Sequence, residues 1–341
     1  MPKISIEQLD QVITAVLGQS KAPLLADPDL SRYVRIATEL HDLPKADFRV
    51  RLKDELERMA IMTKTKTASS RKQESTETES QIASGDSSKS VREGFHTITP
   101  YLAVREAPEL IEFVKEAFGA EGHIYGIGSQ GGLHAEYKIG DSIIMIGGGE
   151  EWRGTPMPTA LHTYVDDVDA VYQRALDAGA ISMVEPLEDH GERLAGVKDV
   201  AGNEWYIAKR LSGSHTDEGL HTVNVYLHPL GAAEMIEFLK PAFAAEEVAV
   251  YRPEPGGPVV HAKVKIGNSV LEMGEAHGPY QPMPTMFFLY VDDVDAWYQR
   301  AVASGATSTS EPTNQAYGDR VASVTDPFGN TWYIATHVSR T

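Results

Sequence analysis

The sequence predicts an α+β protein in which two tandem domains each contain a pair of βαβββ units. Three observations predict this class. Residues 164–180 (YVDDVDAVYQRALDAGA) return as residues 290–306 (YVDDVDAWYQRAVASGA), with four differences in seventeen positions. Further motifs recur in the same order at an offset of 125 to 127 residues. Within each copy, strand-like apolar runs surround two segments with helical spacing, and such periodicity is the main signal of secondary structure.

The N-terminal part differs in character from the two copies. Residues 1–62 predict a small helical segment, because apolar residues such as Ile6, Leu9 and Val12 recur at helical spacing. Residues 63–92 are nearly all Ser, Thr, Lys, Glu and Gln, and such a composition cannot bury enough apolar surface to offset chain entropy. We therefore predict a disordered linker at 63–92.

In the first domain, residues 93–211, each βαβββ unit is a strand, a helix and three strands. The first unit reads as TITPYLAV, the helix APELIEFVKEAF, and the strands HIYGI, LHAEYKI and SIIMIG. The second unit reads as TALHTYV, the helix VDAVYQRALDAGA, and the strands ISMVEP, LAGVKDV and EWYIAKR. Gly179 is the expected C-terminal stop of the second helix. A joint at 212–220 leads into the second domain, residues 221–341, where the same order repeats.

Composition excludes several classes of function. The net charge of −18 disfavours a nucleic-acid partner, because phosphate binding needs clustered Lys and Arg. The absence of cysteine excludes disulfides and thiol chemistry. No apolar run approaches the roughly 20 residues of a membrane helix, and the first residues contain no signal-peptide core. We therefore expect a cytoplasmic protein with neither a nucleic-acid nor a membrane partner.

Several linked motifs point to a family. They are an ITPYL start, HAE with IGDS, YVDDVDA with YQRA and AGA, and a closing FGN with WYIA. Together they resemble the PhnB-like branch of the vicinal oxygen chelate superfamily, which includes glyoxalase I, bleomycin-resistance proteins and extradiol dioxygenases. The resemblance covers residues 95–337 and not 1–92. It implies a curved mixed sheet with helices outside, a ligand cavity on the concave face and, in metal-dependent members, four metal-ligand positions on strands.

Carried onto this sequence, those four positions hold few usual metal ligands. They fall on Thr99, Met145, Ala160 and Tyr206 in the first copy, and on Asn224, Glu272, Met286 and Tyr333 in the second. Only Glu272 is a usual ligand among these eight residues. We therefore predict no superfamily metal and no other cofactor, with a divalent metal held by His261 and Glu272 as the alternative.

Strand alternation places a set of polar and aromatic side chains on the concave face. Histidine and carboxylate side chains suit proton transfer, and the catalytic candidates are His134, His162, His261 and Glu272. Arginines at the rim suit carboxylates, and aromatic rings suit a planar ligand. The ligand-binding candidates are Tyr101, Glu136, Arg193, Asn224, Tyr226, Lys263, Phe288, Tyr290, Arg320 and Tyr333. The alternatives are structural: a histidine bonded within the cavity wall, a salt bridge for each arginine, and simple packing of the rings.

Two other motifs favour structural roles. Residues 126–131 match G-x-G-x-x-G but lead into a strand, whereas a dinucleotide fingerprint leads into a helix. The acidic run at 166–169 stands where a strand meets a helix, and aspartate at that position caps the helix.

These observations favour a protein that binds a small organic ligand in its concave cavities, with the two copies forming an intramolecular pseudo-dimer. A homodimer is a further alternative. Two other functions stay open: a metal-dependent isomerase, lyase or dioxygenase of the same superfamily, and a ligand-sensing interaction protein that uses the N-terminal helices.

Overall fold

The computed structural model describes residues 90–128 and 130–337. The chain divides into two units, Met1–Gln81 and Ile82–Thr341, and every described residue belongs to the second unit. The helical segment predicted at 1–62 and nearly all of the linker predicted at 63–92 therefore lie outside the described residues. Among the described helices, none has the length and apolar character needed to cross a membrane.

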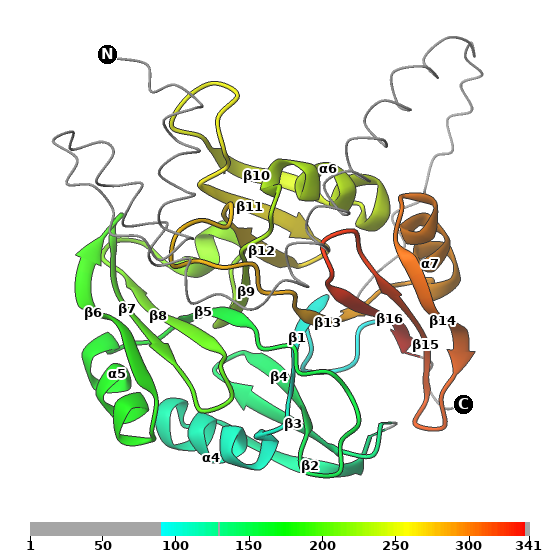
Figure 1. Ribbon diagram of the computed structural model, residues 1–341, viewed down its shortest axis with the longest axis horizontal. Coiled ribbons are helices and arrows are strands. Elements are labelled where there is room, and N and C mark those ends of the chain that lie inside the picture. Colours follow the sequence, from blue (N-terminus) through cyan, green and yellow to red (C-terminus); the bar gives the residue numbers. More distant parts are fainter. Residues whose placement is uncertain (1–89, 129, 338–341) are drawn as a thin grey trace, which may run out of the picture. The chain divides into compact units, whose positions relative to one another are not determined.

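Four consecutive βαβββ units make up the described part of the chain (Figure 1), which confirms the predicted α+β class. The first copy contains β1 (Ile98–Val104), α4 (Ala107–Phe118), β2 (Glu121–Ile127), β3 (Leu133–Ile139), β4 (Ser142–Gly148), β5 (Ala160–Tyr164), α5 (Val168–Asp177), β6 (Ile181–Asp189), β7 (Glu192–Lys198) and β8 (Glu204–Arg210). A short 3-10 helix (His215–Glu218) precedes the second copy. The second copy contains β9 (Val223–Leu227), α6 (Ala232–Phe243), β10 (Glu246–Tyr251), β11 (His261–Ile266), β12 (Ser269–Met273), β13 (Met286–Tyr290), α7 (Val294–Ala303), β14 (Thr307–Asn314), β15 (Asp319–Thr325) and β16 (Thr331–His337).

Each of the two eight-stranded sheets takes one unit from each copy. Sheet 1 has the order β14-β15-β16-β13-β1-β4-β3-β2, and sheet 2 has the order β10-β11-β12-β9-β5-β8-β7-β6. The copies meet at a central antiparallel pair, where Thr99 lies opposite Phe288 in sheet 1 and His162 lies opposite Asn224 in sheet 2. The next strand on each side is parallel to its neighbour, so both sheets are mixed. A site at the middle of either sheet is therefore built by both copies.

The α-helices of the described residues, α4 to α7, pack on one face of the sheets and contribute to the main core. Successive strand residues point to opposite faces. Phe287 and Leu289 of β13 accordingly belong to the main core, whereas Phe288 and Tyr290 belong to a separate cluster on the other face. We call that other face the helix-free face. Of the side chains that strand alternation assigned to a cavity wall, Tyr101, Phe288, Tyr290 and Tyr333 pack in this cluster.

The repeated stretch acts as scaffold. Asp167 precedes α5 and its carboxylate accepts the Ala170 N–H at 3.0 Å, and Asp293 does the same for Ala296 before α7 at 3.1 Å. These bonds confirm the predicted caps, which satisfy backbone donors at the helix starts. Gly126 and Ile127 are the last residues of β2, and the next element is β3, which begins at Leu133, so the glycine-rich motif leads into a strand and not into a helix.

Candidate functional site

The centres of the two helix-free faces differ in chemistry at repeat-related positions. On sheet 1, Met145 and Phe288 are buried in an apolar cluster with Tyr290. On sheet 2, Glu272 stands where sheet 1 has Met145, and His162 stands where sheet 1 has Phe288. Sheet 1 therefore has an apolar centre, whereas sheet 2 has a charged one.

His162 on β5 links two carboxylates from different parts of the chain. Its Nδ1 lies 2.7 Å from Oε2 of Glu272 on β12, and its Nε2 lies 3.5 Å from Oε2 of Glu192 on β7. The other oxygen of Glu192 accepts the Tyr164 hydroxyl at 2.9 Å and lies 3.1 Å from Nε of Arg210. Because both ring nitrogens of His162 face carboxylates, the protonated ring is the form that satisfies both contacts.

The surrounding charges set the protonation states of this cluster. Burial alone would lower the pKa of His162, but the Glu272 and Glu192 carboxylates outweigh it and raise the pKa to about 9. Burial would raise the pKa of Glu192, but His162, Tyr164 and Arg210 lower it to about 2. The pKa of Glu272 is likewise lowered, because His162 outweighs the effect of burial. At neutral pH the cluster is therefore an imidazolium between two carboxylates.

Glu136 and Lys263 occupy repeat-related positions and each forms an ion pair, but with opposite signs of charge. Both Nη atoms of Arg92 donate to the carboxylate of Glu136 on β3, at 2.6 and 2.8 Å. At the repeat-related position on β11, Lys263 pairs with Glu218. In each case the partner comes from the segment before the first strand of the same copy. The strand residue changes from a carboxylate to an ammonium between the copies, and its partner changes from the cation Arg92 to the anion Glu218.

His134 and His261 make the same contact with a tyrosine hydroxyl. Nδ1 of His134 lies 3.2 Å from the Tyr101 hydroxyl, and Nδ1 of His261 lies 3.4 Å from the Tyr226 hydroxyl. Burial lowers the pKa of His261, an effect that Glu272 partly opposes. The ring of His261 is 3.9 Å from Glu272 through Nε2, so it lies at the edge of the His162 cluster.

Three other predicted ligand-binding residues are engaged in local structure. Arg193 makes a bidentate pair with Asp169 at 2.5 and 2.7 Å, and Arg320 does the same with Asp295 at 2.7 Å. The Asn224 amide bonds to the backbone of the segment just before β9 and is 4% exposed. The structure thus places both arginines in the salt bridges named as their alternative.

A small cavity opens on the helix-free face of sheet 1. Its wall is formed by β1, β3, β4, β13 and β16 and by the segments before β3 and after β4, and it combines aromatic and apolar side chains with the polar Gln130. The lining includes Tyr101, Leu133, Gly147, Trp152, Met286 and Tyr333. A Cβ at Gly147 would lie 2.6 Å from the Tyr101 hydroxyl, so a larger residue at this position would displace the Tyr101 ring.

The repeat-related part of sheet 2 is occupied by packed rings. Tyr206 and Tyr226 replace Tyr333 and Tyr101. Their rings pack against each other with centroids 5.6 Å apart, and the ring of Tyr280 stacks on His228 at 5.2 Å. Burial lowers the pKa of His228 to about 4, so this ring is neutral at neutral pH, and its Nε2 lies 3.1 Å from the Tyr206 hydroxyl. A separate groove is lined by Leu227, Met235 and Phe328, which pack with the main core, and also by His228.

The strand positions that carry metal ligands in the superfamily regroup by sheet. Thr99, Met145, Met286 and Tyr333 share sheet 1, and Ala160, Tyr206, Asn224 and Glu272 share sheet 2. Neither set fits a divalent ion, because each lacks the several His or carboxylate donors that such an ion needs. The one carboxylate, Glu272, is already bonded to His162.

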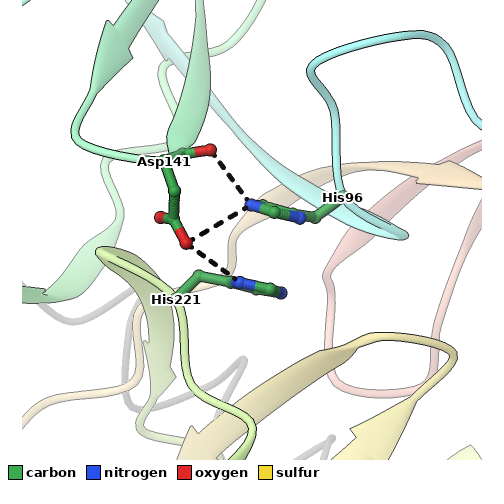
Figure 2. Close-up of side chains that lie close together, drawn as sticks. All are labelled: His96, Asp141 and His221. Carbon is green, nitrogen blue, oxygen red and sulfur yellow. Dashed lines mark hydrogen bonds and ion pairs between the residues drawn. The ribbon is translucent and has the colours of Figure 1, made fainter. Parts of the chain in front are cut away.

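A different group of potential metal ligands lies between the two sheets and was not predicted from the sequence. Figure 2 shows His96, Asp141 and His221 together, and their ligand atoms all lie within 4.8 Å of one another. The two imidazole rings stack with centroids 3.4 Å apart and planes 7° from parallel. Repeat alignment relates the two histidines, but their contact is visible only once the copies are folded together.

Sequence reasoning also missed Glu192, Trp152 and Arg92. Glu192 stands next to Arg193 in the GER motif, and strand alternation would have placed it on the same face as His162. Trp152 and Arg92 lie outside strands, so no periodicity signals their approach to the site.

Comparisons with known proteins agree with this architecture. Residues 231–334 match the family model of the Glyoxalase/Bleomycin resistance protein/Dioxygenase superfamily. An uncharacterized protein of Mycobacterium bovis is 34% identical over 118 residues, which cover 31% of this chain and 77% of that protein. An uncharacterized protein of Mycobacterium tuberculosis has the same identity over 118 residues and is covered to 69%.

Solved structures give the same result for the fold. Glyoxalase I from Zea mays superposes with a TM-score of 0.55 at 14% sequence identity, covering 70% of this chain and 92% of that one. At this identity the similarity concerns the fold alone.

Proposed function

Because the chain belongs to the glyoxalase/bleomycin resistance protein/dioxygenase superfamily, we propose that it binds a small, planar organic ligand in the cavity on the helix-free face of sheet 1. The observation that carries the proposal is the cavity itself. Tyr101, Trp152 and Tyr333 line it, with Met286. Ligand sites of this kind are apolar hollows with a few polar groups that orient the ligand.

The polar groups of the cavity point to the class of ligand. The hydroxyl of Tyr101 lies next to Nδ1 of His134, and burial raises the pKa of Tyr101. The phenol therefore stays neutral and acts as a hydrogen-bond donor or acceptor. Since none of the described side chains that line the cavity wall is charged, the ligand is expected to be uncharged in the part that enters, and aromatic or conjugated. No superfamily metal is needed for such binding.

The two sheets supply a matched control. Tyr333 lines the cavity, whereas its repeat-related counterpart Tyr206 packs on the face without one. Tyr333→Ala is expected to weaken ligand binding at least about fivefold, because an aromatic contact contributes about 1 kcal/mol beyond area burial. Tyr206→Ala is expected to leave the affinity unchanged.

The measurement begins with native mass spectrometry of the full-length protein, to identify a co-purified ligand. Binding is then followed by quenching of tryptophan fluorescence, since Trp152 is in the wall, with 8-anilinonaphthalene sulfonate as a probe. Equal loss of affinity in both tyrosine variants would place the ligand elsewhere and contradict the proposal.

A second candidate function is acid–base catalysis on sheet 2. It is favoured by the assembly of His162, Glu272 and Glu192 within hydrogen-bonding or ion-pair distance. The protonated His162 would donate a proton to one atom of the substrate, Glu272 would take a proton from another atom, and that proton would return to His162 across their 2.7 Å contact. Isomerase or lyase turnover that His162→Gln abolishes and Tyr333→Ala leaves intact would support this role over ligand binding on sheet 1.

A further inference from the structure

The two copies are joined by a reciprocal pair of turns. The turn between β3 and β4 places Asp141 against Thr222, whose N–H donates to Oδ1 of Asp141 at 2.8 Å and whose hydroxyl accepts the Asp141 N–H at 3.2 Å. In the repeat-related turn, Asn268 makes the same two bonds with Thr97, at 2.7 and 3.1 Å. The two turns therefore differ mainly in that one carries a carboxylate and the other an amide.

His96 and His221 precede these threonines and stack on each other between the turns. Nε2 of His221 lies 2.7 Å from the Asn268 carbonyl oxygen, and Nε2 of His96 lies 3.1 Å from the Asp141 carbonyl oxygen. A carbonyl accepts only, so Nε2 of His221 donates. In the neutral ring this leaves a lone pair on Nδ1.

That lone pair faces a carboxylate oxygen. Nδ1 of His221 lies 3.4 Å from Oδ2 of Asp141. The other oxygen of Asp141 is bonded to the Thr222 N–H and to the Ser142 hydroxyl at 2.8 Å, so Oδ2 is the one turned toward the histidines, as Figure 2 shows. A ring nitrogen held by a carbonyl and a carboxylate held by N–H and O–H groups are the outer contacts that orient metal ligands.

We propose that His221, Asp141 and His96 bind one divalent first-row transition ion, such as Zn²⁺, at the junction of the two copies. The donors are Nδ1 of His221, Oδ2 of Asp141 and Nε2 of His96. Donors about 2.0–2.1 Å from a tetrahedral ion lie about 3.4 Å from one another. The distances to Oδ2 of Asp141 are 3.4 Å from His221 and 4.0 Å from His96.

The ion requires one local rearrangement. Ring nitrogens bind in the plane of the ring, and two parallel rings cannot direct both planes at one point. His96 therefore turns about its side-chain bonds, gives up its bond to the Asp141 carbonyl, and carries its ring proton on Nδ1 instead of Nε2. The side chains of both histidines are 19% exposed and that of Asp141 is 45% exposed, so the ring can turn and water can complete the coordination.

This site is separate from the superfamily metal positions and does not depend on ligand binding on sheet 1. His96 and Asp141 come from the first copy and His221 from the second. The ion would therefore cross-link the start of β1 and the β3–β4 turn to the start of β9. Its expected effect is to stabilise the joined copies, because an ion that binds only the folded state raises the unfolding temperature.

The test exploits the difference between the two turns. Asp141→Asn removes the donor oxygen, while Asn268 demonstrates that an amide makes the same turn bonds with a threonine. The full-length protein is stripped with a chelator and titrated with Zn²⁺ by calorimetry. We expect Asp141→Asn to weaken Zn²⁺ binding by roughly 100-fold or more, since the loss of an outer contact alone costs about 10- to 100-fold.

The double variant Asp141→Asn with Asn268→Asp moves the carboxylate to the repeat-related turn, where His96 takes the place of His221. We expect it to restore Zn²⁺ affinity to within about 10-fold of the original and to restore the Zn²⁺-dependent rise in unfolding temperature. His221→Asn is a second variant that removes a donor without touching the turns. The proposal is overturned if the original protein binds no Zn²⁺ at micromolar concentrations, or if Asp141→Asn or His221→Asn binds it equally well.

Discussion

The buried pair of His162 and Glu272 allows a sharp test of the reasoning, because sheet 1 already contains the apolar version of the same positions. We consider the variants His162→Phe and Glu272→Met, alone and combined, which give sheet 2 the residues of sheet 1. Phe288 and Met145 pack in an apolar cluster there, so the introduced side chains have a matching environment within the same fold.

The single changes are expected to be costly. His162→Phe leaves the Glu272 carboxylate, which is 1% exposed, without its cation, and an uncompensated buried charge costs about 3–5 kcal/mol. Glu272→Met leaves His162 with Glu192 at 3.5 Å, so one charged hydrogen bond worth about 1.5–3 kcal/mol is lost.

The double change removes both charges together, and replacement of a buried ion pair by apolar residues is often close to neutral. We therefore expect the double variant to lie within about 2 kcal/mol of the original protein. The single costs add up to about 4.5–8 kcal/mol, so the two positions should show a coupling energy of at least about 2.5 kcal/mol. Urea unfolding of the full-length proteins at pH 7 measures all four free energies of unfolding. Additive costs, with a coupling near zero, would refute the claim that the two side chains form one electrostatic unit.

Two further predictions concern stability. The pKa of folded His162 is raised from 6.5 to about 9, so its proton stabilises the fold fully below pH 6.5 and this stabilisation is lost as the pH rises through 9. At about 1.4 kcal/mol per unit, the free energy of unfolding should fall by about 3 kcal/mol across that range, and a pH series in which the His162→Phe/Glu272→Met variant shows the same fall would contradict the assignment. Gly267→Ala should lower the free energy of unfolding by at least about 1–3 kcal/mol, because φ is +59° and the new Cβ would lie 2.3 Å from Oγ1 of Thr97. Gly256→Ala, with φ of +76° and open space around it, should cost less in thermal unfolding, and an equal cost would show that backbone strain alone matters.

Much of the fold follows from local pattern. The period of two in β13 separates Phe287 and Leu289 from Phe288 and Tyr290, and the structure places these pairs on opposite faces. The acidic run at 166–169 predicts an aspartate cap from its place between a strand and a helix, and Asp167 is that cap. These properties depend on residues close in sequence, so the sequence expresses them directly.

The contacts of the candidate site depend more on residues that are distant in sequence. His134 and Tyr101 were placed on one face by alternation, and they lie in contact. Arg193 was a candidate for anion binding, but Asp169 reaches it from the start of α5. Arg92 pairs with Glu136 from outside any strand, and no periodic pattern predicts that approach.

By itself the sequence determined the four βαβββ units, the faces of their strands and the superfamily, because side-chain spacing and repeated motifs encode each of these within one copy. Tertiary structure alone decided which unit joins which sheet, and with it the chemistry of each face. His162 and Glu272 are 110 residues apart and belong to different copies, and they meet only because β5 pairs with β9. The same association of units from different copies brings His96 and His221 together. The energy of a charge depends on what lies within a few ångströms of it, and that neighbourhood is set by the pairing of distant strands.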